Sequence, residues 1–460
     1  MVVLLKIIQV ILALSLLVLF HEFGHYSFAK LFKTRVEKFY LFFNPRRSIV
    51  KFKRFGGKLH FKFFSANKDP EWDAHPDHTE YGVGWLPFGG YCKIAGMIDE
   101  SMDTEAMKQP PQPYEFRTKK AWQRFFIMFG GVFFNFILAV VLYAAILGTW
   151  GEEFLRNDDA VHGVAVNDLS YEIGFRDGDR ILAFDGQPVE NFSDLQVDLI
   201  RSQARTATVL RDGDTLSVAI DPDYLPAMLN TPGMFDLAFP FVVKEVPADS
   251  PNAGAGLLPG DAFEGIDGKK MFIVQQIQKE LLQHREAAVT AAVRRGDTAL
   301  ELPLQVDSAG HVGVLLDTDL HKYFNVTTRS YSLFSAIPAG ARKAWNTVKD
   351  YVQELGLIFS PKTQAYKSVG SFIAIGRIFP DTWDWYRFWS LCALLSIMLG
   401  VMNLLPIPAL DGGHILLLIF EMLTGRRPSD KFMAVIEWIG MALLLMLMVL
   451  AFGNDIRSLF

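Results

Sequence analysis

The chain has 460 residues, of which 50% are hydrophobic and 21% are charged, and its formal net charge is −5 at pH 7. It is long enough for several domains and too apolar for a purely soluble protein, so we expect membrane-spanning segments and no nucleic-acid partner. The two cysteines, Cys92 and Cys392, exclude a disulfide framework and leave a cysteine-type zinc site unsupported.

The first apolar run, residues 1–32, is predicted to be a transmembrane helix that carries a metal-site motif near its end. It is too long for a signal peptide, and no small-residue cleavage site follows it. Residues 21–25 have the pattern HExxH, in which His21 and His25 share a helix face and can bind one Zn²⁺ while Glu22 activates water. At 1.5 Å per residue, the motif lies roughly 28 Å along the helix, near the far side of a ~30 Å hydrocarbon core. The competing interpretation is a signal anchor that ends in two interfacial histidines.

The segment 33–120 is predicted to be a membrane-associated β region with a linker, on the cytoplasmic side of the membrane. Between Lys30 and Lys68, twelve lysines and arginines accompany one acid, Glu37. Such an excess of basic residues next to a span marks a cytoplasmic segment. Four spans then place both termini and the long middle region outside the cytoplasm.

Two parts of this β region read as strands. Residues 49–63 alternate apolar and basic side chains around Gly56-Gly57, which predicts a β-hairpin with a tight turn. Residues 81–91, which include Gly84, form a second extended candidate. We expect the hairpin or the strand near Gly84 to hold a substrate extended by β-augmentation.

A second span is predicted at 121–148, and the region after it contains an internal repeat. Gly178-Asp179 recurs as Gly260-Asp261 at an offset of 82 residues. Two copies of one small β-rich domain, at 158–223 and 236–310, explain this better than one large domain. The repeated pattern resembles the PDZ domain of bacterial envelope proteases. Peptide capture and a role as rigid spacers are both open for either copy.

Residues 331–380 are predicted to form a juxtamembrane amphipathic helix, followed by a third span at 387–415 and a fourth at 432–453. Within the third span, two prolines and two glycines break the helix, and broken helices at membrane depth line cavities. Asp411 is the candidate third metal ligand, because a catalytic zinc has three protein ligands and one open position. Asn403 and His414 offer hydrogen bonds there. The alternative for Asp411 is a loop N-cap.

The HExxH motif together with N-x-x-P-x-P-x-x-D-G at 403–412 resembles the site-2 protease family of intramembrane zinc metalloproteases. The two PDZ-like repeats between the second and third spans are similar to its regulator of sigma-E protease (RseP) branch. The resemblance covers nearly the whole chain. It implies four transmembrane helices, a membrane-associated β-hairpin or sheet and two tandem extracytoplasmic PDZ-like domains, in the inner membrane of a bacterial cell.

The resemblance also implies roles for individual residues. The implied site comprises the zinc ligands His21, His25 and Asp411, the general base Glu22, and the substrate-binding or oxyanion residues Asn135 and Asn403. The family's second span carries G-P-x-x-N, and this chain keeps Gly131 and Asn135 but has Val132 in place of the proline.

The implied function is an intramembrane zinc endopeptidase. Its implied substrates are single-pass membrane proteins of the anti-sigma factor type, already trimmed by an upstream site-1-type protease, and remnant signal peptides. The PDZ pair would exclude substrates with bulky extracytoplasmic domains. One rival is a proteolytically inactive, membrane-anchored PDZ scaffold, against which the four intact zinc-site residues argue. Another is a metal transporter, which is weaker because no other span has a comparable polar cluster.

Overall fold

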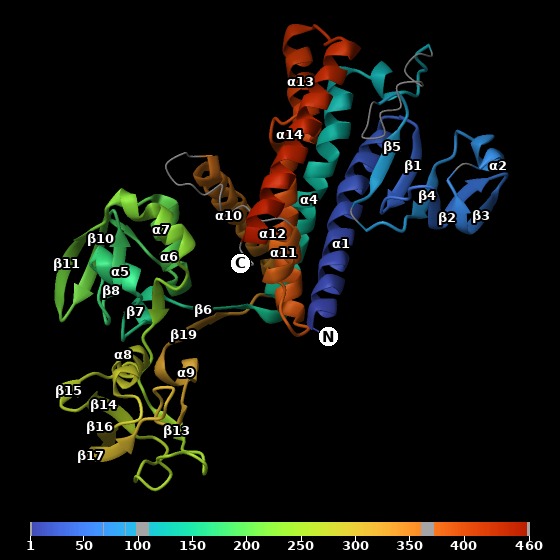
Figure 1. Ribbon diagram of the computed structural model, residues 1–460. Coiled ribbons are helices and arrows are strands. Elements are labelled where there is room, and N and C mark those ends of the chain that lie inside the picture. The colour runs from blue at the N-terminus through green and yellow to red at the C-terminus, as the bar shows by residue number, and fades with distance from the viewer. Residues whose placement is uncertain (1, 68, 88, 98–109, 360–371, 458–460) are drawn as a thin grey trace. The chain divides into compact units, whose positions relative to one another are not determined.

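The computed structural model describes residues 2–67, 69–87, 89–97, 110–359 and 372–457. The chain separates into two compact units, shown with their elements in Figure 1. The first unit comprises Met1–Gly151, Ser330–Gly356 and Tyr366–Phe460, and the second comprises Glu152–Arg329 and Leu357–Ala365. Much of the predicted linker, residues 98–109, lies outside the described residues.

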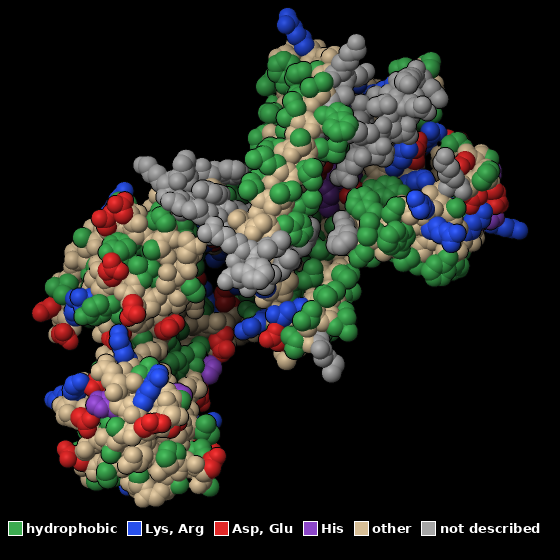
Figure 2. All heavy atoms as spheres, viewed as in Figure 1, with side chains coloured by type: hydrophobic (Ala, Val, Ile, Leu, Met, Phe, Trp, Pro, Cys, Tyr) green, Lys and Arg blue, Asp and Glu red, His purple; other side chains and the backbone are tan. Residues whose placement is uncertain are grey.

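Among the described residues, the first unit contains four helices that could span a membrane, the number predicted from the sequence. They lie in α1 (Val2–Leu31), α4 (Ala121–Trp150), α12 (Trp385–Leu404) and α14 (Asp430–Arg457, of which Trp438–Asp455 is the span). Each is long and apolar enough to cross a bilayer. Val141, Trp438 and Val449 of these helices are more than half exposed, and Figure 2 shows many hydrophobic side chains on the side of the helical bundle that faces the viewer. Exposed apolar helix faces of this kind are favourable in contact with lipid and unfavourable in contact with water.

The predicted third span is not one helix. Its helix α12 ends at Leu404, and a new helix, α13 (Asp411–Thr424), begins after a break. Pro406 and Pro408 lack the N–H group that a helix interior needs, and Ala409 takes a left-handed conformation with φ of 72°. The break therefore places Asp411 at the first turn of α13.

A five-stranded sheet packs beside α1 in the order β3-β2-β4-β1-β5. Its strands are β1 (Val36–Leu41), β2 (Arg47–Phe55), β3 (Lys58–Ala66), β4 (Glu80–Val83) and β5 (Tyr91–Ile94). The hairpin prediction is confirmed, since β2 and β3 meet at Gly56 and Gly57, whose φ angles of 60° and 74° suit a primed turn. β4 pairs with β1 on one side and β2 on the other, so the strand near Gly84 has no free edge for a substrate.

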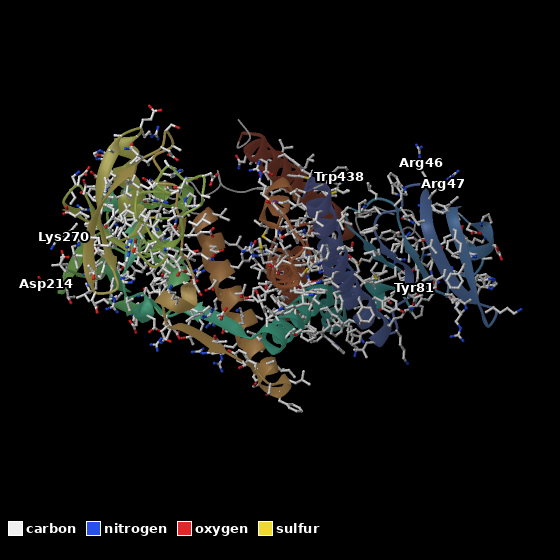
Figure 3. All side chains as sticks on the ribbon, turned by 90° about the horizontal axis from the view of Figure 1, so that it is seen from below. Arg46, Arg47, Tyr81, Asp214, Lys270 and Trp438 are labelled. Carbon is white, nitrogen blue, oxygen red and sulfur yellow. The ribbon has the colours of Figure 1, made fainter. Side chains whose placement is uncertain are left out.

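The two faces of the hairpin differ as the alternation predicts. Phe61 and Phe63 are more than half exposed on one face. On the other face the side chain of Lys51 is buried and its ammonium group lies over the ring of Trp72 in α2 (Pro70–Asp73). Figure 3 labels Arg46 and Arg47, at the start of β2, whose side chains point outward from the sheet. Tyr81 of β4, also labelled, shares a hydroxyl hydrogen bond with Tyr26 of α1, which fastens the sheet to the motif helix.

The amphipathic helix expected in 331–380 corresponds to α10 (Leu333–Phe359), and residues 360–371 lie outside the described residues. Gly340 lets α10 approach the backbone of α4, where a Cβ atom would come within 2.5 Å of the Ala144 nitrogen. Its other face exposes Phe334 and Trp345. The short helices η1 (Phe116–Thr118) and α11 (Phe372–Ile378) complete the first unit.

The second unit contains two sheets with the same topology, ordered β11-β10-β8-β9 and β17-β16-β14-β15. The first repeat has β7 (Val164–Val166), α5 (Asp168–Ile173), β8 (Arg180–Phe184), β9 (Gln187–Pro188), α6 (Leu195–Ser202), β10 (Thr206–Arg211), β11 (Asp214–Ala219), α7 (Leu225–Asn230) and β12 (Phe235–Leu237). The second has β13 (Val243–Glu245), β14 (Ala262–Ile266), β15 (Lys269–Lys270), α8 (Val274–Leu281), β16 (Ala288–Arg295), β17 (Thr298–Gln305) and β18 (Leu315–Leu316). Each sheet has its own apolar core.

In each repeat an early strand pairs with one beyond the expected boundary, β7 with β12 and β13 with β18. The structural repeats therefore extend further along the chain than the sequence pattern indicates. Remaining elements are β6 (Glu152–Leu155) paired with β19 (Val326–Arg329), α9 (Leu320–Tyr323), and the 3-10 turns η2 (Asn157–Asp159), η3 (Phe192–Asp194), η4 (Pro222–Tyr224) and η5 (Leu282–His284).

In both copies the aspartate of the repeated Gly-Asp motif is buried and forms an ion pair with a partly exposed arginine. In the second copy, Arg295 Nε and Nη2 each lie 2.7 Å from the carboxylate of Asp261, and Nη2 also donates to the Gly256 carbonyl. In the first copy, Arg211 holds Asp179 in the same two-pronged way. Asp261 has no exposed surface, so its charge depends on this partner.

We expect Arg295→Ala to destabilise the second repeat at pH 7. The Arg295 guanidinium holds the pKa of the Asp261 carboxyl below its usual value, so the native state favours the charged form more than the unfolded state does. The stabilisation is therefore present above the unfolded pKa of about 3.9 and is lost as pH falls below it. Pulse proteolysis in urea should show the midpoint shift at pH 7 and a smaller shift at acidic pH.

Arg294→Ala is the matched control, because Arg294 is the neighbouring residue and pairs with a partly exposed Glu264. Equal effects of the two substitutions at pH 7 would contradict a special role for the buried pair.

Candidate metal centre

The helices α1 and α4 cross at glycines, which brings their backbones into direct contact. A Cβ atom on Gly24 would lie 2.1 Å from the Gly130 oxygen, and one on Gly130 would lie 2.6 Å from the Gly24 oxygen. A side chain at either position would force the helices apart, as at other close helix contacts in membranes. Figure 1 shows α1 and α4 side by side in the bundle. The crossing lies at the HExxH motif.

Three side chains that can bind a metal converge beside this crossing: His21 and His25 from α1 and Asp411 from the start of α13. The two Nε2 atoms lie 3.2 Å apart, and Asp411 Oδ2 lies 3.3 Å from His21 Nε2 and 3.4 Å from His25 Nε2. Ligand atoms around a tetrahedral zinc stand roughly 3.3–3.4 Å apart, given zinc–ligand distances of about 2.0–2.1 Å. The triangle of ligand atoms therefore matches one face of a zinc tetrahedron.

The chemistry of the cluster also calls for a cation. The three side chains are only 9–12% exposed. Among the residues that the structure describes, Asp411 Oδ2 has no polar partner beyond these two ring nitrogens. A buried carboxylate oxygen and two ring nitrogens in mutual contact are stabilised when a metal ion accepts all three lone pairs. These residues fit a zinc ion with one open coordination position.

Gly131 leaves the space that the two rings occupy. A Cβ atom at this position would lie 2.4 Å from His25 Nε2 and 2.6 Å from His21 Cε1. We expect Gly131→Ala to raise the zinc Kd on the order of 10–100-fold, because misoriented ligands cost that much. Competition for zinc between the protein and a chelator measures this Kd.

Gly148→Ala is the control on the same helix, since its Cβ would meet only Ala336 Cβ at an ordinary 3.5 Å. An unchanged zinc Kd in Gly131→Ala would show that the rings move aside at no cost to the metal site.

The remaining predicted site residues surround the cluster. Glu22 accepts a hydrogen bond from the Cys92 backbone N–H of β5. Asn403 Nδ2 lies 3.5 Å from His21 Nε2, on the side where the ligands meet. Asn135 Nδ2 lies 3.1 Å from the other nitrogen of that ring, Nδ1. His414 lies outside the three-ligand cluster and lines a small cavity with Leu417 and Ile436.

Two contacts at the site were not predicted from the sequence. The Ile127 carbonyl lies 2.9 Å from His25 Nδ1, and the Cys92 N–H reaches Glu22. Both groups belong to the backbone, which carries no residue-specific signal. The sequence could have indicated the close approach at Gly131, because the pair Gly130-Gly131 interrupts a run of bulky residues.

The chain is similar to several known proteins. The model of peptidase family M50 matches residues 9–66 and 70–447. A protein of Ralstonia nicotianae that is provisionally named a zinc metalloprotease is 27% identical, over 99% of each chain. The regulator of sigma-E protease RseP of Salmonella typhimurium is 28% identical, over 98% of each chain. A solved PDZ domain of an SdrC-like protein from Listeria monocytogenes is 25% identical over 18% of this chain and 92% of its own, with a TM-score of 0.16.

Proposed function

Because this chain belongs to peptidase family M50 and is a zinc metalloendopeptidase, we propose that it cuts peptide bonds within the membrane. The observation that carries the proposal is the ligand triangle of His21, His25 and Asp411 on helices that are long and apolar enough to span a bilayer. Ionisable groups are costly at membrane depth and are retained there for function. The proposed substrates are single-pass membrane proteins, of the anti-sigma factor type, and remnant signal peptides.

In the proposed reaction Glu22 transfers one proton, and the other residues of the site orient Glu22 and the substrate. Bound zinc supplies Lewis acidity to water and to the scissile carbonyl. Glu22 accepts the proton of the attacking water and returns it to the leaving amine. The Cys92 N–H holds the Glu22 carboxylate in place. Asn403, at the ligand side of His21, donates a hydrogen bond to the substrate.

The test is cleavage of a tagged single-pass protein that lacks its extracytoplasmic domain, with the purified enzyme reconstituted in lipid. Mass spectrometry of the products should locate the cut inside the substrate's membrane segment. Cuts confined to the flanking polar segments would contradict intramembrane cleavage. Zinc binding without any cut in a series of such substrates would favour the scaffold.

In the proposed topology the β-sheet side of the first unit faces the cytoplasm of a bacterial cell, and both termini and the two repeats lie outside it. The basic residues between Lys30 and Lys68, including the exposed Arg46 and Arg47, support this orientation. A cysteine placed at Arg47 should react with a membrane-impermeant maleimide only after the cells are opened. Labelling in intact spheroplasts would reverse the orientation.

The two repeats of the second unit act as PDZ-like domains that exclude untrimmed substrates, so that cleavage follows an upstream protease. The support is the PDZ-like sequence pattern and the shared sheet order of both copies. We expect deletion of residues 160–316, which removes both repeats through β18, to allow cleavage of a substrate that keeps its extracytoplasmic domain, while a trimmed substrate is cut at the wild-type rate. Gel analysis of both substrates measures the ratio. Unchanged discrimination would contradict the filter.

A further inference from the structure

Each zinc-ligating histidine has a second ring nitrogen, and both of these face α4. The ligand atoms meet at the Nε2 side of the rings, so each Nδ1 lies at the far edge of its ring. His25 Nδ1 lies 2.9 Å from the Ile127 carbonyl, and His21 Nδ1 lies 3.1 Å from the Asn135 side chain. The two partners are about two turns apart on α4. This helix therefore forms the outer support of the metal centre.

The contact at His25 fixes the position of its proton. A carbonyl oxygen only accepts hydrogen bonds, so His25 Nδ1 carries the hydrogen. A neutral imidazole has one N–H, which leaves the lone pair of Nε2 free for a metal. The backbone of α4 thus selects the form of His25 that can bind zinc.

His21 needs the same tautomer, because it offers Nε2 to the same ion. Its Nδ1–H then needs an acceptor, and ligating histidines almost always have one. Asn135 is the side chain at that position. It is fully buried, and its Oδ1 has no hydrogen-bond partner among the described residues. A half-turn about the Cβ–Cγ bond exchanges Oδ1 with Nδ2 and brings this oxygen to His21 Nδ1.

We propose that Asn135 is a positioning residue, whose Oδ1 accepts the hydrogen bond of His21 Nδ1–H and so orients the ring for zinc. This differs from the oxyanion or substrate contact expected from the sequence, since the amide lies at the ring edge away from the ligand atoms. Ser396 of α12 donates to the Asn135 backbone carbonyl at 2.8 Å, which holds the residue between α1 and α12. The inference rests on the zinc ligands of the proposed function and adds a residue that acts through one of them.

The test compares Asn135→Leu and Asn135→Asp in the full-length protein, because leucine removes the acceptor and aspartate keeps it without the amide donor. The zinc Kd is measured by competition with a chelator, and cleavage is measured at saturating zinc. Asn135→Leu should raise the zinc Kd about 10–100-fold, and excess zinc should restore its cleavage. Asn135→Asp should keep the zinc Kd within about threefold of wild type. Tyr143→Phe, which alters a buried hydroxyl elsewhere on α4, is the control and should keep the wild-type zinc Kd.

A wild-type zinc Kd in Asn135→Leu overturns the inference. So does a loss of cleavage of about 10²–10³-fold at full zinc occupancy in either variant, because that loss marks a missing oxyanion donor. If Asn135→Leu does not fold, Asn135→Ala, which also lacks the acceptor, takes its place in the same two measurements. A wild-type protein that binds zinc but cuts no substrate counts against the proposed function and leaves the zinc comparison valid.

Discussion

Glu22→Gln is expected to lower the rate of intramembrane cleavage by about 10³-fold while one zinc ion stays bound. Glutamine keeps the shape of the side chain and its contact with the Cys92 N–H, but it cannot take a proton from water. The ligand atoms of His21, His25 and Asp411 are unchanged, so zinc affinity should be close to wild type. Cleavage of a trimmed single-pass substrate and zinc content by atomic absorption measure the two effects.

Glu71→Gln is the matched control, since Glu71 lies on α2 with a side chain that is 59% exposed. It should cut at the wild-type rate. A loss of less than about tenfold in Glu22→Gln would remove Glu22 as the general base. Loss of zinc in that variant would instead make Glu22 part of the metal site.

Asp411→Asn is expected to weaken zinc binding by more than about 100-fold, and cleavage should fall with zinc occupancy. The substitution is isosteric, but it removes the negative charge that balances zinc in a site where the three ligands are 9–12% exposed. Chelator competition gives the Kd. Excess zinc should restore part of the cleavage, because the amide oxygen still occupies the ligand position.

Asp381→Asn serves as its control, since Asp381 is 70% exposed and pairs with Lys6 near the other end of α12. Its zinc Kd should equal that of wild type. A wild-type zinc Kd in Asp411→Asn would remove Asp411 from the ligand set and leave the third ligand to another residue.

The proposed metal ligands could be predicted from the sequence because their side chains carry the metal-binding groups. His21 and His25 have the spacing of one helix face, and the prolines and glycines before Asp411 mark the break that frees it. Strand β1 was missed, since it pairs in parallel with β4, some forty residues later, and no local turn marks it. The contact of Asn135 with Nδ1 of His21 was also missed, because it depends on how α4 packs against α1.

The close contact of α1 and α4 at Gly24 and Gly130 does not complete the site, since His25 and Asp411 lie 386 positions apart in the chain. In the proposed site, zinc would join His25 to a residue that is synthesised 386 positions later. A ribosome must pass Asp411, and α13 must reach the bundle, before the third ligand is available. A nascent chain that stops before α13 would therefore hold only part of the proposed metal site, and the proposed cleavage would have to wait for that helix.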